Sequence, residues 1–106
     1  MKRGLKMDWY CLVFNSGEIN GAGSAQYLYE KICEGDFSLV GDIDIIDNLY
    51  NELMEKNFKI TADKGPGFIV IGCSLEDADF IDDFVSELCK KHKLSYYEPQ
   101  NMRYQF

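Results

Sequence analysis

GFIVIGCSLEDADFIDDFVSELCKKHK, residues Gly67 to Lys93, is the stretch that decides the fold. Its apolar, largely β-branched run at residues 68–71 follows the turn residues Gly-Pro-Gly at 65–67 and predicts a buried strand. Ser74, with Asp77 three residues later, has the spacing of a helix N-terminus. Three lysines within residues 90–93 suit the negative end of a helix dipole. The stretch therefore predicts a strand followed by a helix that ends near Lys93.

This predicted helix has two different faces. At roughly 100° per residue, one stripe is apolar and the opposite one is acidic. The apolar stripe consists of Ala78, Ile81, Phe84, Val85, Leu88, Cys89 and His92. The opposite face consists of Glu76, Asp79, Asp83 and Glu87. No basic residue occurs from Ser74 to Glu87, so we expect one strongly acidic helix face on the surface.

Length and composition indicate one domain. A chain of 106 residues can bury a real core without disulfides or metal, and no apolar run approaches the length of a bilayer span. Residues 1–7 contain three basic residues and no acidic one, and we expect a flexible basic extension there and a single α+β domain over 8–106. No signal peptide is evident, and the four cysteines form no paired metal motif. We therefore expect a cytoplasmic protein with reduced, buried cysteines.

The net charge of −7 bears on the class of partner. The stretch between Lys31 and Lys56 contains seven acidic residues and no basic one. Binding to nucleic acid is disfavoured, because contacts to phosphates need positive charge. An acidic surface instead suits a basic protein partner, which opposite charge would steer into contact.

The first half of the chain predicts one strand and two helices. Residues 8–15, DWYCLVFN, form a strand in which both alternating sets of side chains are apolar, so we expect it to be buried on both faces. Ser24 begins a helix that ends near Glu34. A second helix begins at Asp42 or Asp44 and ends near residue 57. Its outer face carries a second set of acidic residues, Asp44, Asp47 and Glu55.

The remaining segments complete one sheet. Alternation at residues 58–62 predicts a short half-exposed strand, followed by a turn at 63–67. Residues 94–98 and 102–106 predict a terminal hairpin. The element order favours an α+β fold with a single, mainly antiparallel sheet and the helices packed on one face. We expect a ferredoxin-like β-α-β-β-α-β core with the helix at 24–34 as an extra helix.

The residues offer little for catalysis, so we expect no enzyme activity, no cofactor and no metal. His92 is the only histidine and lies on the apolar stripe, where packing or capping explains it. The acidic residues at 79–83 lie within a helix, which cannot wrap a calcium ion as a loop does. The glycine-rich loop at 15–24 lacks the lysine of a phosphate-binding loop. The tyrosines at 96, 97 and 104 form either a recognition surface or the outer face of the hairpin.

A resemblance covers about two-thirds of the chain. The run GPGFIVIGCSLEDADFIDDFVSELCKKHKLSYYEPQ, from Gly65, resembles the C-terminal half of a group of small, acidic, stand-alone bacterial proteins. The opening WYCLVFN resembles that group too, whereas the loop from Gly17 to Gly23 departs from it. Members of such groups resemble immunity proteins of contact-dependent inhibition and polymorphic toxin systems. The resemblance implies binding and neutralisation of a cognate toxin domain, and it implies no catalytic residue.

We therefore predict an immunity protein that binds a basic toxin domain, expected to be a nuclease, as a monomer in a 1:1 complex. An acidic helix face can imitate the phosphates that a basic nuclease site grips. The predicted contact residues on the helix near the C-terminus are Glu76, Asp79, Phe80, Asp83 and Glu87. The alternative contact residues, on the preceding helix, are Asp44, Asp47 and Glu55.

Two functions of other classes stay open at this point. The first is a small ligand-sensing or regulatory module that dimerises, since ferredoxin-like sheets commonly bind small molecules between copies. The second is a small enzyme that uses Glu98 with Tyr96, for which a deep pocket around the carboxylate would be the sign.

Overall fold

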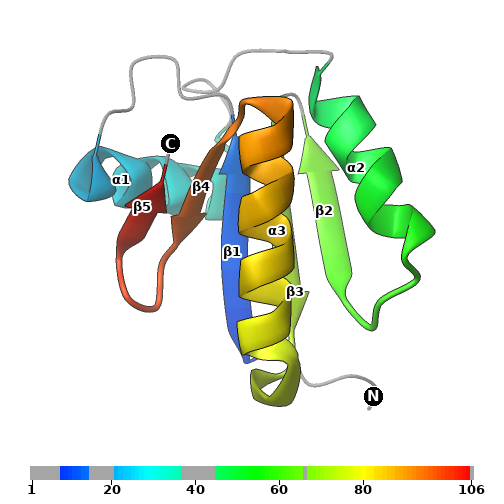
Figure 1. The fold of residues 1–106 in the computed structure, drawn as a ribbon. Helices are drawn as coiled ribbons and strands as arrows, with labels where there is room; N and C mark the ends of the chain where they lie inside the picture. Colours follow the sequence, from blue (N-terminus) through cyan, green and yellow to red (C-terminus); the bar gives the residue numbers. More distant parts are fainter. Residues whose placement is uncertain (1–7, 15–20, 37–44, 66, 106) are drawn as a thin grey trace.

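The computed structural model describes residues 8–14, 21–36, 45–65 and 67–105. Five strands form one antiparallel sheet in the order β2-β3-β1-β4-β5 (Figure 1). The strands are β1 (Trp9–Phe14), β2 (Thr61–Gly65), β3 (Phe68–Cys73), β4 (Ser95–Glu98) and β5 (Arg103–Gln105). The helices are α1 (Ala22–Cys33), α2 (Ile45–Glu55) and α3 (Ala78–His92), and the 3₁₀ turn η1 (Leu75–Asp77) precedes α3.

The topology confirms the predicted α+β fold and its ferredoxin-like core. The core elements follow one another as β1, α2, β2, β3, α3 and β4, and the four strands lie in the order second, third, first, fourth. β1 is central and pairs with β3 along its whole length, with Cys11 opposite Ile71 and Val13 opposite Ile69. β5 extends the sheet as the second strand of the terminal hairpin. The strand with apolar side chains in both alternating sets is therefore the middle of the sheet.

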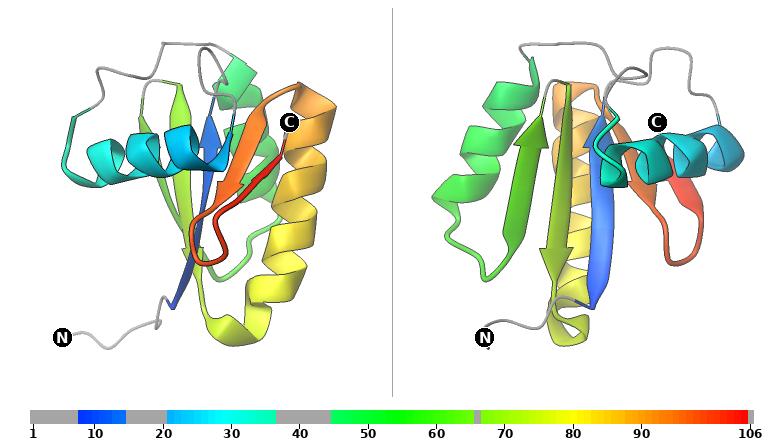
Figure 2. Two further views of the ribbon diagram at one scale, coloured as in Figure 1. Left: turned by 90° about the vertical axis from the view of Figure 1, so that its left-hand side faces the viewer. Right: turned by 180° about the vertical axis from the view of Figure 1, so that it is seen from behind.

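The two faces of the sheet are covered by different helices. On one face α2 and α3 pack against Cys11, Val13, Ile69 and Ile71 (Figure 1). On the other face α1 packs against Leu12, Phe14, Phe68 and Tyr97, and the right-hand view of Figure 2, from behind, shows it lying in front of β4 and β5. The expectation that all helices share one face is right for α2 and α3 and wrong for α1. The reason lies in β1, whose two apolar sets each need a cover to be removed from water.

The bounds of β2 and of the turn that follows it differ from the prediction. β2 begins at Thr61 rather than at residue 58, and its hairpin to β3 turns only between Gly65 and Gly67. Gly67 has a φ of 76°, which glycine adopts without strain. A side chain at residue 65 would clash with the ring of Phe68. Residues 58 and 60 are apolar because they pack against the core, although they lie in the segment before the strand. Their alternation with polar residues therefore placed the predicted strand too early.

The helix ends follow simple backbone chemistry. α3 begins at Ala78, after η1, and the Ser74 hydroxyl donates a hydrogen bond to the Asp77 carboxylate (3.3 Å) instead of capping a backbone N–H. Lys93 ends α3 in the left-handed conformation, with a φ of 59°. α1 begins at Ala22, two residues before the predicted Ser24.

The predicted extension at 1–7 and the start of α2 at residue 42 or 44 lie outside the described residues. No helix in the described part of the chain is long and apolar enough to cross a membrane.

Candidate functional site

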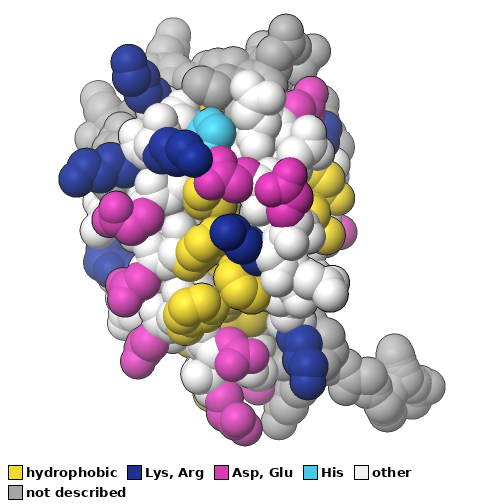
Figure 3. Space-filling view, turned by 45° about the vertical axis from the view of Figure 1, so that its right-hand side comes forward, with side chains coloured by type: hydrophobic (Ala, Val, Ile, Leu, Met, Phe, Trp, Pro, Cys, Tyr) yellow, Lys and Arg dark blue, Asp and Glu magenta, His cyan; other side chains and the backbone are white. Residues whose placement is uncertain are grey.

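The outer surface of α3 is divided into three parallel rows of side chains. At 100° per residue, Asp79, Asp83 and Glu87 form a central acidic row. Phe80 and Phe84 form an aromatic row on the side toward α2, and Asp82 lies on the opposite side, toward the terminal hairpin. Figure 3 shows acidic side chains beside a central patch of hydrophobic ones on this part of the surface.

The acidic row is exposed, and its carboxylates form no ion pair with the residues that the structure describes. Asp79, Asp83 and Glu87 are all exposed, as is Glu76 in η1. No basic side chain among the described residues forms an ion pair with any of them. The structure thus brings together four of the residues predicted as partner contacts, with their charges available to a second protein.

The aromatic row is part of a three-ring cluster. Phe58, from the segment between α2 and β2, meets Phe80 and Phe84 edge to face, with ring centroids 5.3 Å and 5.0 Å away. Phe80 and Phe84 stack with centroids 6.3 Å apart. Phe80 nevertheless keeps 57% of its surface exposed, whereas Phe58 and Phe84 are partly buried. The sequence indicated Phe80 as an apolar anchor but not Phe58, because its approach to α3 depends on tertiary packing.

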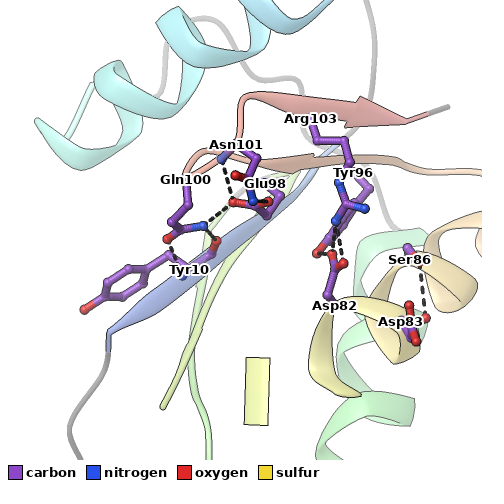
Figure 4. A network of polar contacts seen from close by, with 9 residues as sticks. All are labelled: Tyr10, Asp82, Asp83, Ser86, Tyr96, Glu98, Gln100, Asn101 and Arg103. Atoms are coloured by element: carbon purple, nitrogen blue, oxygen red, sulfur yellow. Dashed lines mark hydrogen bonds and ion pairs between the residues drawn. The ribbon is translucent and has the colours of Figure 1, made fainter. Parts of the chain in front are cut away.

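Asp82 makes structural contacts within the protein and does not belong to the exposed acidic row. Its carboxylate accepts hydrogen bonds from the Tyr96 hydroxyl and from the Arg103 guanidinium, and so ties α3 to β4 and β5 (Figure 4). Tyr96 is fully buried. Burial raises the pKa of the Tyr96 hydroxyl far above its ordinary value, and the neighbouring Cys11 and Asp82 raise it further. The hydroxyl is therefore a neutral donor to the Asp82 carboxylate.

Glu98 is the one buried carboxylate among the described residues, with 1% of its surface exposed. It accepts hydrogen bonds from the backbone and side-chain amides of Asn101 (3.0 Å and 2.8 Å) and from the side-chain amide of Gln100. That same amide of Gln100 pairs with the backbone of Tyr10, donating to its carbonyl (2.8 Å) and accepting from its N–H (2.7 Å) (Figure 4). Glu98 thus holds the hairpin turn and its contact with β1. Glu98 and Tyr96, the pair considered for an enzyme, are each engaged in separate structural networks.

The acidic residues of α2 are largely neutralised within the fold. Lys64 pairs with Asp47 (2.6 Å). Glu52 pairs with Lys91 (2.9 Å) and His92 (3.0 Å), and hydrogen bonds from these two side chains lower the pKa of the Glu52 carboxyl. His92 therefore joins α3 to α2, in line with the packed role expected from the sequence.

Besides Asp47, the predicted contact residues of the α2 face are Glu55 and Asp44. Glu55 is exposed at the end of α2 and forms no ion pair with a described residue. Asp44 lies outside the described residues. The alternative contact set therefore retains one unpaired carboxylate within the described part of α2.

The tyrosines at the terminal hairpin do not form the predicted surface. Tyr96 and Tyr97 are fully buried, and the Tyr97 hydroxyl donates to the side chain of Gln26 in α1 (2.5 Å). Tyr104 is half-buried and its ring lies against Phe14. Both earlier interpretations, a recognition surface and an outer hairpin face, are wrong for residues 96 and 97. The cause is that both faces of the sheet are covered. α1 packs over Tyr97, and Tyr96 belongs to the cluster formed with α2 and α3.

A shallow hollow lies on the α1 side of the sheet. It has a volume of about 310 Å³ and is open to solvent. Its lining is mostly apolar and consists of Ile32, Cys33, Asp63, Lys64, Gly65, Phe68 and Val70.

The cysteines differ in exposure. Cys33 is exposed, whereas Cys11, Cys73 and Cys89 are buried, and burial raises the pKa values of these three thiols. Within the described ranges, no group of three His, Cys, Asp or Glu side chains is arranged to hold a metal ion.

Comparisons of the chain with protein-family models, curated proteins and solved structures find no match. The resemblance to immunity proteins therefore stays an expectation, and we infer the function from the residues and geometry of this protein alone.

Proposed function

We propose that this protein is an immunity protein that binds a basic toxin domain through the outer surface of α3 and neutralises it in a 1:1 complex. The single observation that supports this proposal is the exposed Phe80 ring beside a row of carboxylates without ionic partners in the described fold. Protein interfaces combine a central aromatic anchor with polar groups that select the partner. The acidic sign selects a basic one.

The free carboxylates distinguish α3 from α2 as the binding surface. Asp47 and Glu52 on α2 are already paired with basic side chains of this protein, so a partner would have to displace those pairs. Asp79 and Asp83 require no such displacement. The α3 surface therefore offers the partner more binding free energy for the same number of charges.

A nuclease toxin suits this surface best. A nuclease holds its substrate with basic side chains around phosphate groups, and a row of helix carboxylates presents negative charge to the same side chains. Opposite charge would speed the encounter, with association rates up to about 10⁸–10⁹ M⁻¹s⁻¹ at low salt. Such binding weakens as salt screens the charges.

The direct test is rescue of growth by co-production. The partner is sought in the reading frame next to this gene, where we expect a large secreted protein with a basic C-terminal domain. That domain produced alone should stop growth, and co-production of this protein should restore it. Light scattering on the purified mixture should give the mass of a 1:1 complex.

A clear result would contradict the proposal. If the neighbouring domain killed cells equally well with and without this protein, the immunity function would be wrong for that pair. A pulldown from the source cell that recovered only metabolic enzymes would contradict it generally.

The hollow beside α1 supports a second candidate, a small ligand-sensing module. Its volume lies at the lower end of the range of about 300–1,000 Å³ that small-molecule sites occupy, and its lining is mostly apolar. A metabolite bound there would raise the melting temperature, and a Val70→Asp variant would lose that rise. A screen in which no metabolite raises the melting temperature would count against this candidate.

A further inference from the structure

Two basic side chains of this protein share one arrangement. Lys64 pairs with Asp47 (2.6 Å), and its ammonium lies 5.7 Å from the centre of the Tyr50 ring. In α1, Lys31 pairs with Glu34 (3.7 Å) and lies 5.3 Å from the centre of the Tyr27 ring. In each case a cation contacts an aromatic ring of a helix and a nearby carboxylate, that of Asp47 within α2 or that of Glu34 directly after α1. A ring face attracts a cation, and the nearby carboxylate adds to that attraction.

Phe80 and Asp83 also place an aromatic ring beside a carboxylate, but no cation lies between them among the described residues. They are three residues apart on α3, as Asp47 and Tyr50 are on α2, so their side chains are neighbours on the helix surface. Figure 3 shows basic side chains at the border of the hydrophobic patch. Among the described residues, however, no lysine or arginine forms an ion pair with Asp83 or a ring contact with Phe80. The surface thus presents a ring and a carboxylate without the cation that accompanies such a pair at Tyr50 and at Tyr27.

We propose that the partner completes this contact with an arginine, whose guanidinium stacks on the Phe80 ring and donates hydrogen bonds to Asp83. The inference rests on the proposed function, since it names the group through which the basic partner is recognised. Asp79 and Glu87, one helical turn to either side of Asp83, bind further basic side chains of the same partner segment.

Arginine fits the site better than lysine for two reasons. A guanidinium is flat and weakly hydrated, so it can lie on an exposed ring while its edge donates to a carboxylate. It also carries five donors, which can serve several carboxylates of the acidic row at once. A lysine ammonium is compact and strongly hydrated, and contact with an exposed ring removes part of its water. The exposed ring therefore sets a preference between two side chains of equal charge.

The test uses two flexible glycine-serine peptides that are identical except that one contains arginine wherever the other contains lysine. Titration into the isotope-labelled full chain at low salt, followed by nuclear magnetic resonance, gives both affinities. We expect about twofold to fivefold tighter binding of the arginine peptide, the size of a solvent-exposed cation–π contact. The δ-methylene protons of the arginines should shift upfield through the ring current of Phe80.

Three variants locate the preference. Phe80→Leu, which keeps an apolar side chain but removes the ring, should make the two affinities equal. Tyr27→Leu, the matched loss of an exposed ring on α1, should leave the preference unchanged. Asp83→Asn should weaken both peptides to a similar degree.

Equal affinities in the unmodified protein, a preference that survives Phe80→Leu, or no binding of either peptide would each overturn the arginine inference. Equal affinities that fall together in Asp83→Asn would overturn it while leaving the acidic face as the binding surface. Failure of the growth rescue would instead count against the proposed function itself, so the two results can be told apart.

Discussion

Asp82 and Asp83 are consecutive residues of α3, but they belong to two different regions of the molecule. Asp82 faces the terminal hairpin, where Arg103 forms an ion pair with it and the Tyr96 hydroxyl donates a hydrogen bond to it. Asp83 faces outward in a row with Asp79 and Glu87, where no described basic side chain forms an ion pair with it. The first region has the chemistry of a structural contact and the second has the chemistry of a binding surface.

The difference shows how a charge required for folding can be separated from a charge available to a partner. A buried or half-buried carboxylate must be paired, because removal from water is costly. A row of like charges at a spacing of four residues weakens a helix by a few tenths of a kcal/mol per pair, so folding gains nothing from it. We therefore expect substitutions in the first region to lower stability and substitutions in the second to lower affinity.

The largest loss of stability is expected at Glu98, the most deeply buried acidic residue. Glu98→Ala removes the acceptor of three hydrogen bonds from residues 100 and 101, and the free energy of unfolding should fall by about 3 kcal/mol. Denaturation by urea measures this difference. Glu87→Ala, an exposed acid on α3, is the control and should change stability by less than about 0.5 kcal/mol. Similar losses in both variants would remove the distinction between the two regions.

Asp82 and Asp83 represent the two regions at adjacent positions of one helix. Asp82→Ala leaves the buried Tyr96 hydroxyl without its acceptor and should cost about 2 kcal/mol of stability. Asp83→Ala should leave stability unchanged or slightly higher, because it relieves repulsion within the acidic row. Paired urea denaturation curves give both values, and equal losses would contradict the assignment.

An effect of high pH tests the hydroxyl in the first region. The pKa of the Tyr96 hydroxyl is raised in the folded protein, whereas in the unfolded chain it is about 10. Stability from this group is therefore fully present below pH ~10 and is lost above it, at up to about 1.4 kcal/mol per pH unit. Tyr96→Phe should be less stable at neutral pH but should lose stability less steeply above pH ~10. Equal slopes for the two proteins would show that Tyr96 ionises freely in the fold.

The smallest effect is expected at Glu52 on α2. The pKa of its carboxyl is lowered by Lys91 and His92, so its contribution is present above the ordinary value of about 4.3 and is lost as the pH falls through the lowered one. Glu52→Gln should be slightly less stable than the unmodified protein at neutral pH and equal to it in acid. Thermal melts across the acid range measure this, with Glu55→Gln as the unpaired control. A difference that persists in acid would assign the loss to packing.

Much of the fold was predictable from the sequence because its signals are local. The run at 68–71, the stripe from Ala78 to Cys89 and the terminal hairpin each appear as a period or a turn signal. The side of the sheet that α1 covers depends on pairing between distant strands. One signal for it was present, since both alternating sets of β1 are apolar, and a sheet of this kind needs a helix on each face.

The candidate site was predictable only as a list of residues. Helical spacing separates the acidic row from the apolar stripe, and the structure keeps that division. The partners of Asp82 and Asp47 lie 21 and 17 positions away, at Arg103 and Lys64, and no periodicity within one helix indicates them. Neutralisation of one acidic face and not the other is thus a tertiary property, and it determines our choice of α3.

Equal charge reversals on the two helices, followed by measurement of the affinity for the cognate toxin domain, show which helix binds the partner. Asp79→Lys with Asp83→Lys should weaken binding by at least about 100-fold, because two charges at the centre of the interface then repel the partner. Asp47→Lys with Glu55→Lys changes the net charge by the same amount and should weaken binding by less than about tenfold. We expect that order of effects in a single titration series. An unchanged affinity in the α3 pair, or a larger loss in the α2 pair, would contradict it.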